Sequence, residues 1–267
     1  MSHKEKNEND LSNNYKELPS QIKKSLRSID RNSPVPLYLQ LIDSLKKVID
    51  EEEIEQGEFF ATESLLQKET QLSRSTVRKA LEELVRLKHL IRITGKGTFV
   101  SISMPKESVV LSELKSMSQE LLSRGMNPGS IMLNTRKMRP PKKVIEKLQL
   151  NPTEEVLYIE RIRTGNKIPI LYVEAYIPIK IGISNVDEVP ESLYQLVREN
   201  GVLIQNAKHV IGASLMPKTV SKHLGVEESS AGMTMERTTF SNTQSPIIYE
   251  EGIFRADLYS YTLMMQK

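Results

Sequence analysis

Residues 72–100, LSRSTVRKALEELVRLKHLIRITGKGTFV, form the stretch that decides the fold of the N-terminal part of the chain. Ser73 stands where a helix would begin, because its hydroxyl can accept a hydrogen bond from a free backbone amide of the first turn. Apolar residues follow at helical spacing and predict a buried helix face. They are Val77, Leu81, Leu84, Val85 and, as an optional member, Leu87.

The first turn of this helix carries small polar and basic side chains. Arg74 and Arg78 are one turn apart on a face other than the apolar one, with Ser75 and Thr76 beside them. No acidic residue in this turn offsets the positive end of the helix dipole. Such a turn suits an anionic partner, so these four residues are the first candidates for function.

The residues after this helix, 90–102, predict a β-hairpin with a basic tip. β-Favouring residues flank Gly95, Lys96 and Gly97. The run GKGT is similar to the end of a nucleotide-binding loop, but the required upstream glycine is missing and a strand follows instead of a helix. We therefore exclude a nucleotide loop.

Two further helices are predicted upstream of Ser73. Pro36 suits the start of the first, whose apolar positions are Leu37, Leu41, Leu45, Val48 and Ile49. Thr62 can cap a short second helix over residues 63–70, and Gln71 and Leu72 make the turn that follows. Helix, short helix, turn, capped helix and hairpin in this order are typical of a winged helix-turn-helix, which places its third helix in the major groove of DNA.

The distribution of charge is consistent with a polyanion-binding surface in the same segment. Residues 34–67 hold two Lys against eight acidic residues, whereas residues 68–103 hold eight Lys or Arg against three Glu. A local basic face is what a nucleic-acid contact requires. The alternative is a solvated helix face balanced by its acidic neighbour, and charge alone leaves both open.

The whole chain of 267 residues is long enough for two domains with their own cores. It has no Cys, which excludes disulfides and thiolate metal sites, and its formal net charge is only +3. No apolar run approaches the roughly 20 residues of a membrane helix, and the first thirty residues lack the apolar core of a signal peptide. We expect a cytoplasmic protein without membrane contact, cofactor or metal.

The N-terminal segments together resemble the DNA-binding domain of GntR-type bacterial transcription regulators. The resemblance rests on SPVPLYLQLIDSLKKVI (33–49), FFATESLL (59–66) and the opening stretch. The chain has Phe60-Ala61-Thr62-Glu63 where the family usually has Leu-Pro-Ser-Glu. The resemblance implies contacts with double-stranded operator DNA from Thr62, Glu63, Arg74, Ser75, Thr76, Arg78, Lys96, Gly97 and Thr98.

These residue types suit different contacts. A guanidinium can pair with guanine O6 and N7 at once, so we expect Arg74 or Arg78 to read a guanine. Hydroxyls and wing amides mostly bind phosphate. The alternative for Lys96 is a solvated turn residue.

An internal repeat follows a predicted linker in the second part of the chain. Pro105 and an irregular pattern indicate the linker. PKKVIEKL (141–148) then recurs as PKTVSKHL (217–224), and PILYVE (169–174) recurs as PIIYEE (246–251). The repeat predicts two related units of helix plus hairpin in one mixed sheet, with a cleft between the halves.

The first copy of the repeat contains an unusual strand. Residues 154–178 predict a strand, a TGN turn and a second strand. Alternation places Leu157, Ile159, Arg161 and Arg163 on one face. Two guanidiniums thus continue an apolar face. Buried cations need anions, either from protein groups such as Glu160 or Glu174 or from a ligand.

The second part resembles the UTRA effector domain of the HutC subgroup over nearly all of residues 109–263. The supporting runs are SMSQELLSRGMNPGS (116–130), YIERIR (158–163), IPILYVEAYIP (168–178), SLYQLV (192–197), MERTTF (235–240) and FRADLY (254–259). The resemblance implies a fold like that of chorismate lyase, dimerisation through this domain and an effector pocket.

The resemblance also implies effector contacts, because some members of the subgroup bind sugar phosphates. The positions that match phosphate contacts are Ser118, Arg161, Arg163, Ser192 and Tyr194, and the position of Glu174 matches a contact to sugar hydroxyls. Arginine and hydroxyl donors complement a dianion.

Three positions depart from that pattern. Ile248 and Phe254 replace the Glu and Tyr of amino-sugar-phosphate binders, and Met117 stands where aromatic residues are frequent, although it also suits core filling. We expect a phosphorylated sugar or a similar small anion as the effector, and not an amino sugar specifically.

The fold class expected is α+β, with a winged helix-turn-helix over residues 34–103, a linker over 104–111 and a chorismate-lyase-like, mixed-sheet UTRA domain over 112–267. Residues 1–33 are expected to be a disordered or weakly helical extension. Leu18, Ile22, Leu26 and Ile29 could make one amphipathic turn set, but a disordered arm is preferred.

The function favoured by these predictions is repression of transcription. A homodimer would bind a near-palindromic operator and be released by the effector. One alternative is a lyase-like enzyme that uses the second-domain pocket, although the four His show no metal-ligand spacing and no catalytic constellation is present. The other is a regulator without effector response.

Overall fold

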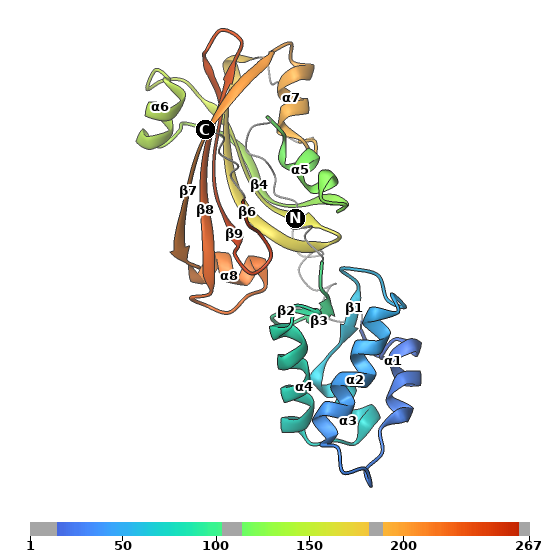
Figure 1. Ribbon diagram of the computed structural model, residues 1–267. Helices are drawn as coiled ribbons and strands as arrows, with labels where there is room; N and C mark the ends of the chain where they lie inside the picture. The colour runs from blue at the N-terminus through green and yellow to red at the C-terminus, as the bar shows by residue number, and fades with distance from the viewer. Residues whose placement is uncertain (1–14, 103–113, 182–188, 262–267) are drawn as a thin grey trace, which may run out of the picture. The chain divides into compact units, whose positions relative to one another are not determined.

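The computed structural model describes residues 15–102, 114–181 and 189–261, and the chain divides into two compact units, Met1–Ser103 and Met104–Lys267 (Figure 1). The predicted linker, residues 104–111, lies outside the described residues. Within the described ranges no helix has the length and apolar character to cross a membrane.

The first unit combines helices with a small sheet. Its elements are α1 (Ser20–Ser25), η1 (Leu26–Ser28), α2 (Leu37–Asp50), β1 (Phe59–Ala61), α3 (Glu63–Thr70), α4 (Arg74–Arg86), β2 (Leu90–Ile93) and β3 (Gly97–Val100). The strands pair antiparallel in the order β1-β3-β2. The predicted winged helix-turn-helix is confirmed.

Hydroxyl caps begin both helices of the helix-turn-helix. Thr62 Oγ1 accepts a hydrogen bond from the Leu65 amide, and Ser73 Oγ accepts one from the Thr76 amide, each at 3.2 Å. Gln71 ends α3 in the left-handed conformation with φ +56°, which costs a residue other than glycine about 1–2 kcal/mol. The caps and this residue set where α4 begins.

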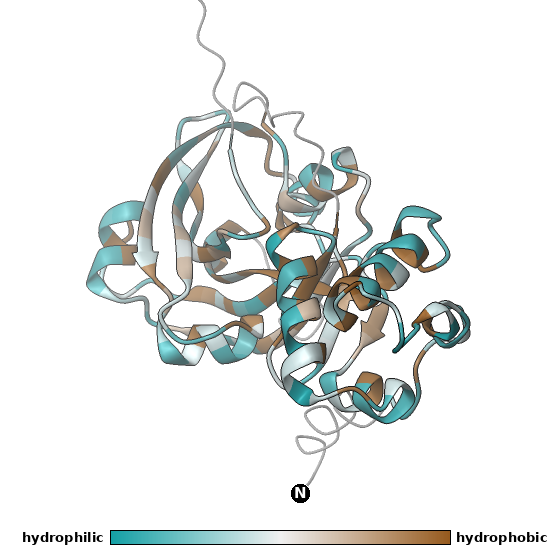
Figure 2. Cartoon of the chain, turned by 60° about the horizontal axis from the view of Figure 1, so that its bottom comes forward, coloured by the Kyte–Doolittle hydropathy of each residue, from teal (hydrophilic) through white to brown (hydrophobic). Residues whose placement is uncertain are grey.

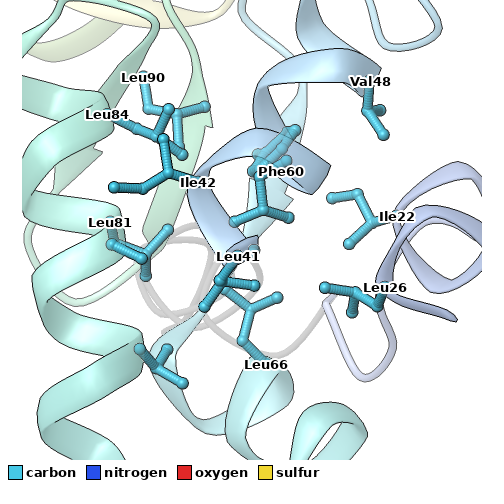
Figure 3. Close-up of a cluster of buried hydrophobic side chains, with 14 of the residues drawn as sticks. Ile22, Leu26, Leu41, Ile42, Val48, Phe60, Leu66, Leu81, Leu84 and Leu90 are labelled. Carbon is cyan, nitrogen blue, oxygen red and sulfur yellow. The ribbon is translucent and has the colours of Figure 1, made fainter. Parts of the chain in front are cut away.

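The core of the first unit lies between its helices and the sheet. Leu41, Leu66, Leu81 and Leu84 are fully buried, and Figure 3 shows their side chains gathered from three helices. Figure 2 shows helices with hydrophobic residues on one side and hydrophilic residues on the other. Leu87 is 44% exposed because it follows the last turn of α4, so the optional member of the predicted face lies outside the core.

Residues 15–33 contribute the apolar side chains of the predicted amphipathic turn set to this core, so the weakly helical form of the extension is present and the preferred disordered arm is wrong for them. Leu18, Ile22 and Leu26 are buried against the side of the core formed by α2. Figure 3 shows Ile22 and Leu26 pointing into the cluster. The predicted amphipathic residues are ordered because α2 presents an apolar face on which their side chains pack. Residues 1–14 lie outside the described residues.

Arg31 ties this extension to the helix-turn-helix. Its Nη2 donates hydrogen bonds to the backbone oxygens of Thr70 and Gln71, each at 3.1 Å. Carbonyls at the end of a helix lack partners within the helix. The extension therefore supports the turn that precedes α4.

The second unit is built on one large sheet. Its elements are α5 (Met117–Ser123), β4 (Pro128–Met138), α6 (Lys142–Leu148), β5 (Val156–Gly165), β6 (Ile168–Pro178), η2 (Ile179–Ile181), α7 (Leu193–Glu199), β7 (Ile204–Leu215), α8 (Lys218–Leu224), β8 (Ala231–Ser241) and β9 (Pro246–Arg255). Among the described residues the strand order is β4-β5-β6-β9-β8-β7.

The internal repeat appears as a repeated order of elements. The series α5-β4-α6-β5-β6 recurs as α7-β7-α8-β8-β9, and β6 pairs with β9 at the centre of the sheet. The predicted unit of helix plus hairpin is confirmed. Each observed unit also contains a preceding helix and an outer strand that the prediction did not include. The halves meet through an antiparallel pair, and each described pairing is antiparallel, so the expectation of a mixed sheet is wrong.

Helices cover both faces of this sheet. α6 and α8 pack against the face that carries Tyr158 and Ile162. α7 packs against the face that carries Leu157 and Ile159, which is also the face of the predicted arginine pair. The arginines are therefore placed between the sheet and a helix layer.

We expect Ile22→Ala to destabilise the first unit, because its fully buried side chain would leave a cavity between α1 and α2. Substitutions of this kind cost about 2–5 kcal/mol. Urea unfolding of the full chain, followed by hydrogen exchange at amides of α2 and α4, measures the change. Lys24→Ala alters an exposed residue of the same helix and should change the unfolding free energy by less than about 0.5 kcal/mol. An equally small change for Ile22→Ala would contradict a structural role of the extension.

Candidate functional site

The first turn of α4 presents the basic residues that the sequence singled out. The side chains of Arg74 and Arg78 are 77% and 58% exposed. Ser75 is exposed beside them, whereas Val77 is fully buried on the other side of the helix. Two guanidiniums are thus open to solvent near the positive end of the helix dipole.

Hydroxyl groups line the N-termini of the two helices. Ser73 Oγ lies 2.9 Å from Ser75 Oγ and 2.8 Å from Thr76 Oγ1, and Thr62 Oγ1 lies 3.0 Å from Ser64 Oγ. A hydroxyl has one proton to donate and two lone pairs, so these contacts leave capacity for a further partner. Ser75 and Thr76 are therefore placed to bind an anion beside the arginines.

Glu63 is engaged by two arginines. Its Oε1 lies 2.7 Å from Arg92 Nη2, and its Oε2 lies 3.6 Å from Arg74 Nε. A carboxylate repels phosphate, so the role that suits Glu63 is the orientation of Arg74 or the acceptance of a hydrogen bond from a cytosine amino group. Arg92 lies 29 residues from Glu63 along the chain, so no local sequence pattern indicates that the two residues pair.

The tip of the β2–β3 hairpin depends on glycine. Gly97 has φ +119°, and a Cβ there would lie 3.1 Å from the backbone oxygen of Ala61. Lys96 is half-buried at the tip. Thr98 is only 2% exposed and pairs with Arg92 in the sheet. The Thr98 hydroxyl lies inside the unit, so a contact of this residue with DNA would have to come from its backbone.

The second candidate site is centred on β5. Arg161 and Arg163 are 3% and 1% exposed and continue the buried face of Leu157 and Ile159, as the alternation predicted. Burying a guanidinium removes its hydration, so each donor needs an acceptor from the protein or from a ligand.

Arg163 has several partners at its two terminal nitrogens. Nη1 donates to Ser130 Oγ at 2.6 Å, to the backbone oxygen of Glu191 at 2.6 Å and to Glu191 Oε2 at 2.8 Å. Nη2 donates to Ser118 Oγ at 2.7 Å. The predicted proximity of Ser118 and Arg163 is confirmed, while Ser130 and Glu191 join the site without a signal in the sequence.

Arg161 has weaker partners. Its Nη1 donates to the backbone oxygens of Pro190 at 3.3 Å and Glu191 at 3.2 Å. No carboxylate among the described residues forms an ion pair with it, and its buried Nε has no hydrogen-bond partner there. Burial, together with the charge of Arg163, lowers the pKa of Arg161 to about 9. The guanidinium still carries its charge at neutral pH.

The second copy of the repeat supplies an internal comparison. Arg237 occupies the place of Arg161, and its Nε lies 2.8 Å from Glu250 Oε2, with both side chains buried. Burial alone would lower the pKa of Arg237, but the charges of Glu250, Tyr194, Tyr261 and Glu120 together outweigh burial and raise that pKa above its usual value. The residue that faces Arg161 in the equivalent register is Val173. The first copy of the repeat thus has no counterpart of Glu250, the carboxylate that pairs with Arg237 in the second copy.

Glu174 lies away from the arginines. It pairs with Glu160 across β5 and β6 and with Glu251 across β6 and β9, on the opposite face of the sheet. It accepts a hydrogen bond from the Tyr158 hydroxyl at 2.7 Å. The predictions that Glu174 joins the effector site, and that Glu160 or Glu174 neutralises the arginines, are both wrong.

Ser192 and Tyr194 lie at the start of α7, directly after Glu191. Ser192 Oγ caps the helix by accepting from the Gln195 amide at 3.3 Å. Tyr194 is buried, with its hydroxyl 3.2 Å from Thr239 Oγ1 and its ring 5.6 Å from the Arg237 guanidinium. Tyr194 therefore borders the second-copy arginine, whereas Ser192 directly follows the residue whose backbone oxygen contacts Arg161 and Arg163.

The three positions that depart from the subgroup pattern are all buried. Met117 begins α5 and is 7% exposed. Ile248 belongs to the apolar cluster under α7, and Phe254 stacks on Tyr259 with ring centroids 4.1 Å apart. No group of His, Asp and Glu side chains within the described ranges has the geometry of a metal site.

We expect Arg161→Met and Arg237→Met to have opposite consequences for stability. Arg237→Met leaves Glu250 buried without its partner and should cost about 3–5 kcal/mol. Arg161→Met removes a buried charge that forms no ion pair among the described residues, so it should change stability by less than about 1 kcal/mol or increase it. Urea unfolding of each full-length variant without added anions measures both values. A loss for Arg161→Met as large as that for Arg237→Met would mean that Arg161 serves the fold.

Two family models match the chain. Residues 37–100 match the model described as "Bacterial regulatory proteins, gntR family", and residues 123–260 match the UTRA domain. These ranges contain the α4 turn and the arginine pair, respectively. Residues 15–33 lie before the first match.

Named proteins are similar to the chain over most of its length. The HTH-type transcriptional repressor NagR of Bacillus subtilis (strain 168) is 28% identical over 242 residues, which cover 90% of this chain and 99% of that protein. The mannosyl-D-glycerate transport/metabolism system repressor MngR of Escherichia coli (strain K12) is 27% identical, covering 87% and 97%.

A solved structure shares the fold. The crystal structure of PhnF from Mycobacterium smegmatis superposes with a TM-score of 0.57 at 20% sequence identity, covering 84% of this chain and 98% of that one. The relatives are transcription regulators and not enzymes. The chain belongs to the GntR family of bacterial regulatory proteins, as a DNA-binding transcription regulator whose second domain is a UTRA effector domain.

Proposed function

We propose that this regulator is a repressor that binds a near-palindromic operator as a homodimer and is released by a small phosphorylated sugar or a similar anion. The observation that carries the effector part is the contrast between Arg161, which has no carboxylate partner, and Arg237, which has Glu250. Location in the cytoplasm, where an operator and a phosphorylated metabolite would meet, belongs to the same proposal.

The DNA-binding residues divide by chemistry. Arg74 and Arg78 are exposed guanidiniums that suit bidentate contacts with guanine, each with about 1–3 kcal/mol of discrimination. Ser75 and Thr76 suit phosphate contacts, and Lys96 with the backbone of Gly97 suits a contact with the DNA backbone at the wing. Thr62 and Glu63 support these groups by capping α3 and holding Arg74.

The effector residues are those that meet at the buried arginines. Arg161, Arg163 and Ser118 offer guanidinium and hydroxyl donors to a phosphate. Ser192, Tyr194 and Met117 lie on helices that approach this face of the sheet. Glu174 is no longer part of the set, since it lies on the other face.

The sugar end of the effector would meet a less polar surface. Ile248 and Phe254 lie on the arginine face and offer no hydrogen bonds to hydroxyl or amino groups. The name of MngR refers to a sugar joined to glycerate, which is consistent with an anionic sugar derivative as effector. These features favour recognition through the anion over recognition through an amino group.

Release from DNA requires coupling between the two domains. An effector that binds one state of the dimer more tightly changes the spacing or freedom of the DNA-binding domains through residues 104–111. Coupling free energies are typically about 1–3 kcal/mol, which corresponds to an affinity change of roughly 5- to 150-fold. Derepression is therefore expected to be graded.

We expect Arg74→Ala and Arg78→Ala to weaken operator binding, and at least one of them to weaken it more than binding to random DNA. Loss of a base contact costs about 1–3 kcal/mol at one operator position, whereas loss of a phosphate contact weakens all sequences alike. Fluorescence anisotropy at fixed salt with both DNAs measures the difference. Arg86→Ala, at the far end of α4, pairs with Glu83 and serves as the control.

Equal losses on operator and random DNA for both variants would reduce Arg74 and Arg78 to backbone contacts. Unchanged binding to every DNA would contradict the assignment of this helix turn as the DNA-reading surface.

We expect phosphorylated sugars, and not their unphosphorylated parents, to raise the melting temperature of the chain. Binding at 100 times Kd stabilises the folded state by about 2.7 kcal/mol. Differential scanning fluorimetry with hexose phosphates, their parent sugars and inorganic phosphate measures the shift. Arg163→Met should abolish it. Shifts from unphosphorylated metabolites only would contradict an anionic effector, and no shift from any ligand would favour a regulator without effector response.

A further inference from the structure

Glu191 places a carboxylate against the buried guanidinium of Arg163. Its Oε2 lies 2.8 Å from Arg163 Nη1 and 3.0 Å from Ser130 Oγ. The two partners differ sharply in environment, because the Arg163 side chain is 1% exposed and the Glu191 side chain is 50% exposed. The ion pair thus joins the half-exposed Glu191 carboxylate to the buried Arg163 guanidinium.

We propose that Glu191 is an affinity-determining residue that competes with the effector anion for Arg163 and swings away when the anion binds. This inference rests on the proposed function of the arginine site. In the absence of the effector, the Glu191 carboxylate binds Arg163 in place of the ligand anion.

The internal repeat shows what a permanent partner looks like. Glu250 is buried and lies directly across the β8–β9 ladder from Arg237, so both side chains are fixed by the sheet. Glu191 comes instead from the segment before α7 and keeps half of its surface in water. Returning a half-exposed carboxylate to water costs little, whereas removing a buried one is expensive.

The hydrogen bonds at Arg163 define what displacement would release. Nη1 is shared by the Glu191 carboxylate, the Glu191 backbone oxygen and Ser130 Oγ, while Nη2 binds Ser118. An oxyanion that binds Nη1 must take the place of the carboxylate. The oxyanion would then also accept the hydrogen bond that Ser130 Oγ now donates to Glu191, so Ser130 would be a further residue in contact with the ligand.

Charge balance favours the exchange for a dianion. With Glu191 in place, two carboxylates, Glu191 and Glu250, face three guanidiniums, Arg161, Arg163 and Arg237, so one positive charge stays uncompensated. A phosphate monoester carries a charge close to −2 at neutral pH. It would compensate both guanidiniums of β5, whereas a monoanion would only replace Glu191. The competition therefore selects for dianionic ligands.

The test is the affinity of the full-length chain for inorganic phosphate by isothermal titration calorimetry. Glu191→Gln keeps the shape of the side chain and removes its charge, and we expect it to bind phosphate about tenfold more tightly than the unaltered chain, through loss of one competing charged hydrogen bond. Glu191→Ala, which also removes the side-chain contact with Ser130, should change affinity in the same direction.

The matched control is Glu199→Gln. Glu199 is an exposed carboxylate on α7 that accepts a hydrogen bond from Gln195, so its loss changes the net charge equally without touching Arg163. We expect its phosphate affinity to stay within about twofold of the unaltered chain, the change typical of a screened surface charge.

Three outcomes decide the matter. Equal phosphate affinity of the Glu191 variants and the unaltered chain would overturn the competition while leaving the anion site intact. An equal gain for Glu199→Gln would also overturn it, because the effect would then be one of net charge. Absence of phosphate binding in every protein would overturn the proposed anion site, and the competition with it.

Discussion

Burial of Arg161 and Arg163 two residues apart on β5 is the constraint on which the second unit depends. Two like charges in a protein interior cost several kcal/mol each unless anions and hydrogen bonds compensate them. The described residues supply one half-exposed carboxylate in an ion pair with Arg163, a few oxygens, and the buried Glu250, which is already paired with Arg237. An anionic ligand would recover this free energy, so the folded domain is expected to become more stable when its effector binds.

The internal repeat shows how the fold can tolerate the free-energy cost of burying arginine charges on a strand. Both halves place an arginine at the same point of the same scaffold, but only the second half faces it with a buried glutamate, Glu250, where the first has Val173. The second half therefore holds a neutral pair that supports the fold. The first half leaves Arg161 without an ion pair among the described residues, and Arg163 pairs only with the half-exposed Glu191.

Short-range patterns predicted much of this molecule, including the caps at Thr62 and Ser73 and the buried face of β5. They could not predict the face of Glu174, because the β5–β6 ladder shifts register between Arg163 and Thr164, and a slip of one residue moves every later side chain to the other face. Tertiary packing decided the remaining cases. Thr98 is buried by neighbouring strands, residues 15–33 fold onto α2, and Glu191 arrives from a distant segment.

The most direct test of the central claim is a crystal structure of the full chain with a bound sugar phosphate. We predict phosphate oxygens at about 2.7–2.9 Å from the guanidiniums of both Arg161 and Arg163. We also predict that the Glu191 carboxylate has left Arg163. A phosphate bound elsewhere, with Arg163 still paired to Glu191 and Arg161 unchanged, would contradict the claim that these arginines are held for an anionic effector.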